Sequence, residues 1–409
     1  MAKVLIIGSG ARESALGQAF LSSRQVTAVY VAPGNAGMPL LGLTPVAITE
    51  EQTAALVAFA AGVDLTFVGP EQPLAAGLVD AFQAAGRPVF GPTQKVAQLE
   101  SSKQFAKAFM AAHHLPTAAV KVAHSQREAI ATAAMMSLPL VIKVDGLAAG
   151  KGVTIATNPE TVQATLASLY AANAQAPVLL EEYLSGQEAS VLAMFNGTKR
   201  VLFPLAQDHK RRFAGDTGPN TGGMGAISPA PQFSTAQQAQ AAALVDQTLA
   251  GMVADGLTST GVLYVGLMFT SHGPKILEYN LRFGDPETQV LLPQVTNDFY
   301  QLTLDLLAGQ APALTLNGQT YCGVVAVNPA YPQSGPALPL VVPTADQCGY
   351  WIPAGVAKQG DALVSHGGRI FTVIGSGADL AAAQREAYAR MAPLQGPLAV
   401  RDDIGAKGL

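Results

Sequence analysis

Short apolar runs that end in glycine-containing loops are spaced through the first hundred residues. The runs cover residues 4–7, 28–32, 65–68 and 89–90, and an alanine-rich helix is expected to follow the first run and end near Ser22. Apolar runs of this kind are typical of buried strands, and strands that alternate with helices form parallel sheets. Open sheets of this type bind ligands at the carboxyl ends of their strands, so the loops after these runs are candidates for a binding site.

The first of these loops, Gly8-Ser-Gly-Ala-Arg-Glu13, departs from the dinucleotide-binding fingerprint. The pattern G-x-G-x-x-G fails at its third glycine, where Glu13 stands, and the second strand leads into Pro33 to Gly37 without an acid for a ribose. A dinucleotide is therefore disfavoured. Backbone amides at a glycine turn before a helix still suit a single phosphate group.

A compact α+β unit is expected between residues 120 and 188. The strand at 140–144 carries Lys143 among branched apolar residues, and a glycine-rich loop, Gly146 to Gly152, leads into a further strand at 153–156. A buried ammonium group needs a partner, and a nucleotide phosphate would serve. Because the loop follows a strand and opens no helix, it is not a Walker A motif, and we expect a hairpin that closes over phosphates.

Two neighbouring segments carry weaker signals for a nucleotide. An amphipathic helix is expected from Ser101 to about His114, and Lys103 near its start is a phosphate candidate, although its spacing alone favours a solvated lysine. The strand that begins at Pro177 ends in Glu181 and Glu182 before a turn. Such an end can offer backbone groups to an adenine edge and a carboxylate to ribose hydroxyls.

The longest polar, glycine-rich stretch of the chain runs from residue 207 to residue 226. Loops of this length inside a compact domain are usually functional or disordered, and a basic triplet at 210–212 favours capture of an anion. Downstream we expect a helix from Ser234, as its cap, to Asp255 and a strand over 261–270. The remaining expected elements are a helix over 291–307, a proline-rich segment over 329–343, a strand over 369–374 and a helix over 379–391.

The most chemically crowded stretch begins at Lys275. An apolar run ends in Glu278 and Asn280, whose side chains leave a strand on the same face because strand side chains alternate with a period of two. Two adjacent oxygen ligands of this kind, completed by substrate phosphates, suit Mg²⁺. Three charged groups, Arg282, Asp285 and Glu287, then follow in an expected turn around Gly284 and Pro286, where they can face a ligand. A solvated strand end is the alternative for any one of these residues.

Composition narrows the class of protein. The chain has 409 residues, which predicts two to four domains, with 49% apolar and 13% charged residues. A net charge of -4 argues against a nucleic-acid partner. The two cysteines, Cys322 and Cys348, lack metal-site spacing and argue against a disulfide framework. Without a signal-peptide pattern or an apolar run near the ~18 residues of a membrane span, we expect a soluble, cytoplasmic protein without a membrane partner.

Taken together, these stretches resemble the phosphoribosylamine glycine ligase family, also called glycinamide ribonucleotide synthetase, of the ATP-grasp superfamily. The resemblance runs nearly end to end and is most specific at Arg282-Phe-Gly-Asp-Pro-Glu-Thr-Gln289 and at Asp216-Thr-Gly-Pro-Asn-Thr-Gly-Gly-Met-Gly-Ala226. Gln207 to Arg211, Pro33 to Gly37 and Arg401 to Gly405 also match, as do Gly69-Pro-Glu71 and Gly146 to Gly152.

The resemblance implies an α/β and α+β multidomain fold. It comprises a Rossmann-like substrate domain over 1–100, a connecting helix segment over 101–119, an ATP-grasp lid over 120–188, an ATP-grasp core with the metal site over 189–323 and a small carboxy-terminal domain over 324–409. It also implies a cytoplasmic ligase of purine (IMP) biosynthesis, expected to be a monomer. ATP would phosphorylate glycine, and 5-phosphoribosylamine would attack the glycyl phosphate to give glycinamide ribonucleotide, ADP and phosphate.

Site roles follow from the same resemblance, residue by residue. Glu278 and Asn280 would hold Mg²⁺ or Mn²⁺, and Arg282, Asp285 and Lys143 would be catalytic. ATP would be bound by Lys103, Lys143, Gly150, Lys151, Gly152, Glu181, Glu182, Tyr183, Leu184 and Glu188. The other substrates would be bound by Gly8, Gly10, Asn35, Gly37, Glu71, Pro73, Asp208, Lys210, Asp216, Asn220, Gly222, Gly223, Arg282, Asp285 and Glu287.

The chain departs from the family pattern at two places. The usual Gly-Gly-Arg-Glu-His of the first turn is Gly10-Ala11-Arg-Glu-Ser14 here, and a glycine-rich loop of the tail is replaced by Asn328 to Gly335. Both changes bear on substrate affinity. The alternatives are therefore another ATP-grasp ligase or carboxylase of nucleotide metabolism, or a nucleotide sensor without catalysis.

Overall fold

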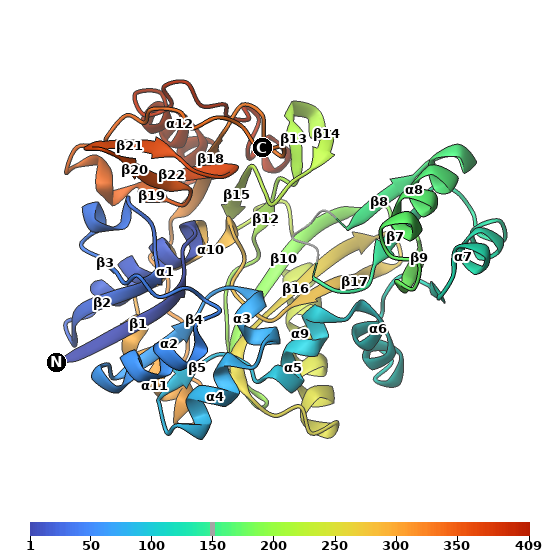
Figure 1. Ribbon diagram of the computed structural model, residues 1–409, viewed down its shortest axis with the longest axis horizontal. Coiled ribbons are helices and arrows are strands. Elements are labelled where there is room, and N and C mark those ends of the chain that lie inside the picture. The colour runs from blue at the N-terminus through green and yellow to red at the C-terminus, as the bar shows by residue number, and fades with distance from the viewer. Residues whose placement is uncertain (148–151) are drawn as a thin grey trace.

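A computed structural model describes residues 1–147 and 152–409 of the chain. Figure 1 shows an amino-terminal domain, a carboxy-terminal domain beside it, and a long central sheet that leads away to a smaller lid. Within the described residues, no helix is long and apolar enough to cross a membrane.

The amino-terminal domain is a parallel sheet with helices on both faces. Its strands pair in the order β3-β2-β1-β4-β5. One face packs Leu5 and Ile7 against Phe82, and the other packs Ile6 against Phe20. Burial on both faces explains the uninterrupted apolar runs of these strands. The elements are β1 (Ala2–Gly8), α1 (Ala11–Leu21), β2 (Val26–Pro33), β3 (Thr44–Pro45), α2 (Thr53–Phe59), β4 (Leu65–Val68), α3 (Glu71–Ala75), α4 (Leu78–Ala84), β5 (Val89–Phe90) and α5 (Gln94–Ser101).

The lid is a four-stranded antiparallel sheet covered by two helices, and it stands apart in Figure 1. Its core packs Leu140 and Ile142 of the sheet against Leu166 of a helix. The elements are β6 (Val120–Ala123), α7 (Gln126–Ala133), β7 (Leu140–Val144), β8 (Val153–Ala156), α8 (Pro159–Ala172) and β9 (Val178–Glu182). The sheet order β6-β9-β7-β8 places β7 beside β9, with Lys143 opposite Leu179.

The central sheet, in the order β11-β10-β16-β17, carries the strand that sequence analysis singled out. Its register shifts so that Gly266 pairs with Glu278 while Leu267 pairs with Ile276, which leaves Leu277 as an extra residue. A bulge of this kind bends a strand and re-aims its side chains, here beside Glu278. The elements are α6 (Lys103–Ala112), β10 (Gln187–Asn196), β11 (Lys199–Leu202), α9 (Thr235–Ala254), β16 (Thr260–Thr270) and β17 (Gly273–Asn280).

The carboxy-terminal sheet is assembled from two distant parts of the chain, in the order β12-β15-β18-β22-β19. β15 comes from the middle of the sequence and pairs with β18 from Gly225 opposite Val324 to Ser228 opposite Tyr321. The expected boundary between residues 323 and 324 therefore falls inside β18. The elements are β12 (Gln207–Asp208), β15 (Gly225–Ser228), β18 (Thr320–Val327), β19 (Trp351–Pro353), β20 (Val356–Gln359), β21 (Ala362–Ser365), β22 (Arg369–Gly377) and α12 (Leu380–Met391).

Two expectations about local structure are wrong: the single helix over 291–307, and an irregular loop over 207–226. The single helix over 291–307 is instead α10 (Glu287–Leu291), a 3-10 turn over Leu292–Gln294 and α11 (Phe299–Leu307). Proline at 293 cannot donate a helical hydrogen bond, and Asp298 caps the new start by accepting the Gln301 N–H at 3.1 Å. Glu287 consequently begins a helix and does not lie in a turn.

The long polar stretch is also more ordered than a loop. It contains the hairpin of β13 (Arg211–Phe213) and β14 (Thr217–Asn220), in addition to β12 and β15. By contrast, the expected cap of α9 is confirmed, because Ser234 Oγ accepts the Gln237 N–H at 3.3 Å.

Candidate active site

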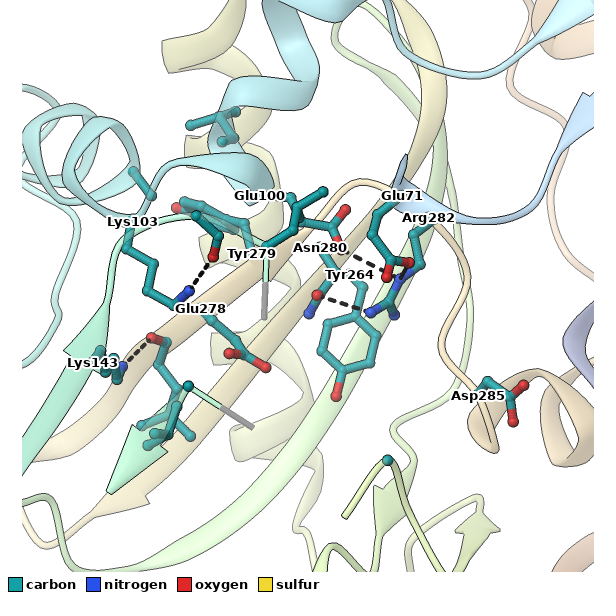
Figure 2. Close-up of a pocket in the computed structure, with 18 of the residues that line it drawn as sticks. Glu71, Glu100, Lys103, Lys143, Tyr264, Glu278, Tyr279, Asn280, Arg282 and Asp285 are labelled. Atoms are coloured by element: carbon teal, nitrogen blue, oxygen red, sulfur yellow. Dashed lines mark hydrogen bonds and ion pairs between the residues drawn. The ribbon is translucent and has the colours of Figure 1, made fainter. Parts of the chain in front are cut away.

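A cavity of about 460 Å³ lies where the amino-terminal domain, the lid, the central sheet and the carboxy-terminal domain meet. Most of the charged residues singled out from the sequence line it, and Figure 2 shows the lysines on one side, Arg282 with its acids on the other, and Glu278 and Asn280 between them. The predicted residues that line the cavity are Glu71, Lys103, Lys143, Gly152, Glu181, Asp208, Lys210, Gly222, Glu278, Asn280, Arg282, Asp285 and Glu287.

On the lid side, Lys143 has a protein partner. Its Nζ lies 2.9 Å from Glu181 Oε2, and the same oxygen lies 3.2 Å from Nζ of Lys107, a residue of α6 that sequence analysis left without a role. All three side chains are at most 10% exposed. The second oxygen, Glu181 Oε1, is buried without a partner within the described residues. A buried acceptor without a donor is costly, so this oxygen favours a ligand with a donor group.

The amino-terminal end of α6 is held by the end of lid strand β7. Asp145 Oδ1 accepts the backbone N–H groups of Lys103, at 2.5 Å, and Gln104, at 3.2 Å. A carboxylate at this end of a helix satisfies free amides and interacts favourably with the helix dipole. Lys103 Nζ in turn donates to Gly146 O at 2.7 Å, and burial lowers the pKa of Lys103. Lys103 is thereby placed on a fixed helix end.

Glu278 and Asn280 both point into the cavity from β17, as their period-two spacing predicts. Burial raises the pKa of Glu278, but Lys210, Lys143 and Arg282 outweigh it and hold the pKa below its ordinary value. In the described part of the chain, no hydrogen bond or ion pair engages the Glu278 carboxylate, so its oxygens are available. One carboxylate and one amide oxygen beside phosphates fit the donor set of Mg²⁺.

No group of three His, Cys, Asp or Glu side chains suited to a metal occurs among residues 1–147 and 152–409. An all-protein cage is therefore not what the described site offers. The pair on β17 fits a metal only when further oxygens come from a ligand or water, as Mg²⁺ prefers when it serves a nucleotide.

Arg282 is surrounded by acids from the amino-terminal domain. Its Nε lies 3.3 Å from Glu71 Oε2 of α3 and 3.3 Å from Glu100 Oε1 of α5. Its Nη2 donates to Asn280 Oδ1 at 3.1 Å. Burial raises the pKa of Glu100 to about 7, with Arg282 acting against that rise. Arg282 thus connects the acids of the amino-terminal domain with the amide of the candidate metal pair.

The carboxy-terminal domain contributes Arg369, at the start of β22. Its Nη1 donates to Gly222 O at 2.6 Å and to Asp285 O at 2.7 Å, and lies 3.3 Å from Asp285 Oδ1. Burial raises the pKa of Asp285, but Arg369 and Arg12 outweigh it and lower the pKa below its ordinary value. Asp285 therefore faces the cavity as a carboxylate.

A second cluster of charged side chains lies beside β12 and α10. Lys210 Nζ is 3.1 Å from Asp208 Oδ1 and 3.3 Å from Glu188 Oε2. Glu287 accepts from Ser190 Oγ at 3.1 Å, and burial and the charge of Asp208 raise the pKa of Glu287. Asp208, Lys210 and Glu287 of this cluster line the cavity.

Twelve predicted site residues do not line this cavity. Asp216 pairs with Arg401, at 3.0 Å, and with Lys407, and Glu182 pairs with Lys275 at 2.7 Å. The others outside its lining are Gly8, Gly10, Asn35, Gly37, Pro73, Tyr183, Leu184, Glu188, Asn220 and Gly223. The calls for Gly150 and Lys151 lie outside the described residues.

Comparison with known proteins decides the family. Three models of phosphoribosylglycinamide synthetase match the chain in succession: the N domain at residues 2–100, the ATP-grasp (A) domain at 101–288 and the C domain at 321–407. The chain belongs to the phosphoribosylglycinamide synthetase family. A phosphoribosylamine–glycine ligase of Lactococcus lactis is 44% identical over 413 residues, which cover all of both chains.

Solved structures of this family and of more distant proteins share the fold. The crystal structure of phosphoribosylamine–glycine ligase from Thermotoga maritima is 33% identical, covers 98% of this chain and 100% of its own, and superimposes with a TM-score of 0.87. N5-carboxyaminoimidazole ribonucleotide synthetase from Thermus thermophilus covers 96% and 98%, with a TM-score of 0.66 and 18% identity, so it supports the fold alone. The predicted ATP-grasp architecture is confirmed.

Two of the departures from the family pattern, Ser14 and the loop over 328–335, make contacts between domains. Ser14 is fully buried and donates from Oγ to Pro353 O at 2.6 Å, and Ala11 packs into the core of its own domain. In the altered loop, Tyr331 Oη accepts the Gly222 N–H at 2.8 Å, and Gly223 N–H is taken by Thr221 Oγ1 at 3.0 Å. Both predicted substrate amides therefore already have protein partners.

Sequence analysis missed four charged residues that this synthetase fold brings to the cavity. Arg12, Glu100, Lys107 and Arg369 all line it. Lys107 was placed on an amphipathic helix without a role, and the other three were given no role at all. Apart from Glu13 next to Arg12, and Thr117 and Ala118 close to Lys107, the partners of their side chains lie from 74 to 271 residues away, so no local spacing could have found these contacts.

Proposed function

We propose that this chain joins glycine to 5-phosphoribosylamine at the expense of ATP and forms glycinamide ribonucleotide, ADP and phosphate. The supporting observation is one cavity that gathers two lysines, a carboxylate and amide pair, and an arginine network, in a chain that matches this ligase family along its whole length. As an ATP-dependent ligase it acts on small molecules.

In the first step, the γ-phosphoryl group of ATP passes to a carboxylate oxygen of glycine, and the bond to the β-phosphate oxygen breaks. Phosphoryl transfer depends mainly on alignment and on neutralisation of charge. Lys103 and Lys143 reach the phosphates from α6 and β7. Glu278 and Asn280 would hold Mg²⁺ or Mn²⁺, which when bound neutralises phosphate charge.

In the second step, the amine of phosphoribosylamine attacks the glycyl carbonyl, an amide bond forms, and phosphate leaves with the electron pair of the broken bond. Arg282 stabilises the negative charge that develops on the acyl phosphate side. Asp285, Asp208, Lys210, Glu71 and Glu287 line the acceptor side. Neither step needs a protein nucleophile.

On the nucleotide side, Glu181 to Leu184 line the adenine and Glu188 reaches the ribose in this proposal. The unpartnered Glu181 Oε1 supports a donor such as an amine at this position. Acyl phosphates hydrolyse, so the site must exclude water. Residues 148–151 of the glycine-rich loop that was expected to close over the phosphates lie outside the described residues. The remaining substrate positions, Gly8, Gly10, Asn35 and Gly37, would contribute from the amino-terminal turns.

The deciding experiment measures ADP release with ATP, Mg²⁺, glycine and freshly generated phosphoribosylamine, with each component omitted in turn and with alanine in place of glycine. Turnover should need glycine and the amine together. ADP release with a different substrate pair would leave the ATP-grasp fold in place and exclude this reaction. No ADP release under any condition would favour a nucleotide sensor.

A further inference from the structure

Glu100 occupies a position that the reaction above does not use. It lies in the last turn of α5, its side chain is 6% exposed, and it reaches the chain just past the end of β17. Glu100 Oε2 accepts the Leu281 N–H at 2.6 Å, and Glu100 Oε1 lies 3.3 Å from Arg282 Nε. One carboxylate therefore holds two consecutive residues.

The sheet does not fix this part of the chain by itself. The last pair between β16 and β17 joins Tyr264 to Asn280, so Leu281 is the first residue without a strand partner. The hydrogen bond from the Leu281 N–H to the Glu100 carboxyl oxygen, at 2.6 Å, supplies the missing constraint. The direction in which Arg282 leaves the strand consequently depends on Glu100.

The constraint extends back to the metal pair. Arg282 Nη2 donates to Asn280 Oδ1 at 3.1 Å, so the guanidinium sets how the Asn280 amide faces the cavity. Figure 2 shows Glu100, Arg282 and Asn280 in one group beside Glu278. Groups that orient a metal ligand in this way typically change metal affinity or activity 10- to 100-fold when they are removed.

Glu71 does not replace Glu100 in this arrangement. It also lies 3.3 Å from Arg282 Nε, but its side chain is 24% exposed, compared with 6% for Glu100. Glu71 makes no contact with Leu281 comparable to that of Glu100. Glu100 is therefore the more buried of the two acids and the one that also holds Leu281.

We propose that Glu100 is a positioning residue of the ligase, which fixes Arg282 and, through Arg282, the orientation of Asn280 toward the metal. This inference rests on the proposed function and on its metal pair. It assigns no contact between Glu100 and a substrate.

The test compares Glu100→Ala and Glu100→Gln with wild type, and uses Gln98→Ala, an exposed position of the same helix, as the matched control. Binding of Mn²⁺ in the presence of ADP is followed by electron paramagnetic resonance, and kcat and the half-saturating metal concentration are measured separately. We expect Glu100→Ala to weaken Mn²⁺ binding about tenfold and to lower kcat 10- to 100-fold. Glu100→Gln should recover part of both because its amide oxygen can still accept the Leu281 N–H, and Gln98→Ala should match wild type.

A separate variant, Glu278→Gln, distinguishes failure of this inference from failure of the metal assignment. Loss of Mn²⁺ binding in Glu278→Gln together with wild-type binding and kcat in Glu100→Ala would overturn the role of Glu100 alone. Wild-type binding in Glu278→Gln would overturn the metal pair and this inference with it. If Glu100→Ala does not fold, the Glu100→Gln variant becomes the test. Metal binding and kcat equal to wild type in Glu100→Gln, which lacks the carboxylate, would overturn the proposal.

Discussion

Lys143 Nζ lies 2.9 Å from Glu181 Oε2, and Lys107 shares that same oxygen from 3.2 Å. Two buried ammonium groups therefore compete for one acceptor. A phosphate that reaches Lys143 must draw it from Glu181, and Lys107 remains as the counterion that keeps Glu181 paired. Removal of a partner from a buried ion pair is costly, so this arrangement eases the transfer of Lys143 to a nucleotide.

Lys107→Met should weaken ATP binding. Without Lys107, Lys143 is the one ion-pair partner left to Glu181 among the described residues, and ATP must break that pair without compensation. We expect the KM for ATP to rise about tenfold, equivalent to about 1.4 kcal/mol, with a smaller change in kcat. Saturation curves for ATP at fixed glycine and amine measure this. Lys121→Met, at an exposed position of β6, is the control, and an unchanged KM in Lys107→Met would contradict the role of Lys107.

Glu278→Gln should lose most turnover while binding of the sugar phosphate survives. The substitution keeps the shape of the side chain and removes the charge that suits a divalent cation. We expect kcat to fall about 100-fold or more, measured as ADP release, with glycinamide ribonucleotide still bound in calorimetry. Glu160→Gln, at an exposed position of α8, should behave as wild type. Equal turnover in Glu278→Gln would refute the metal assignment.

Arg369→Ala should affect the acceptor substrate more than ATP. Arg369 holds the carbonyls of Gly222 and Asp285 together, and its charge lowers the pKa of Asp285. Loss of Arg369 should raise the KM for phosphoribosylamine about tenfold, which corresponds to about 1.4 kcal/mol of binding free energy. The KM for ATP should stay within about twofold of the wild-type value. The exposed Arg385→Ala on α12 serves as control. A rise confined to the KM for ATP would argue against this placement.

Glu50→Gln should stabilise the protein at alkaline pH. Burial and the charge of Glu13 raise the pKa of Glu50 from 4.5 to about 7, so between these values the folded chain keeps a proton that the unfolded chain releases. Stability from this group is therefore lost as the pH rises through that window.

Because Glu50 is partly exposed, solvent screening reduces the expected gain in Glu50→Gln at pH 8 to about 1 kcal/mol, or about 2–4 °C in the unfolding midpoint. The gain should vanish near pH 5. Thermal unfolding at both pH values tests this, with Glu160→Gln, at an exposed position of α8, as the control. A gain of equal size at pH 5 and pH 8 would exclude titration of Glu50 as its cause.

Features that depend on neighbours along the chain were predictable. The shared face of Glu278 and Asn280 follows from strand periodicity, and the Ser234 cap follows from helix-end chemistry. The helix over 291–307 was predicted wrongly because apolar spacing was weighed above Pro293, which ends the first helix.

Contacts between residues that are far apart in the sequence were not predictable. Glu100 meets Arg282 across 182 residues, and Arg369 meets Gly222 across 147, so neither pair leaves a local pattern. The position of Lys107 along its helix is that of a surface lysine. It becomes a buried cation because Glu181 of β9 lies against it. The expected boundary at 323/324 fell inside β18 for the same reason, because its partner β15 comes from the middle of the chain.

Asp145 ends a lid strand and caps a helix that begins 42 residues earlier. A movement of the lid that carries β7 away from α6 would uncover the amides of Lys103 and Gln104, so their exchange with solvent deuterium would report on lid position. Protection of these two amides should increase when ATP is added. Hydrogen exchange at the start of α6 would thus report the position of the lid, a domain to which α6 does not belong.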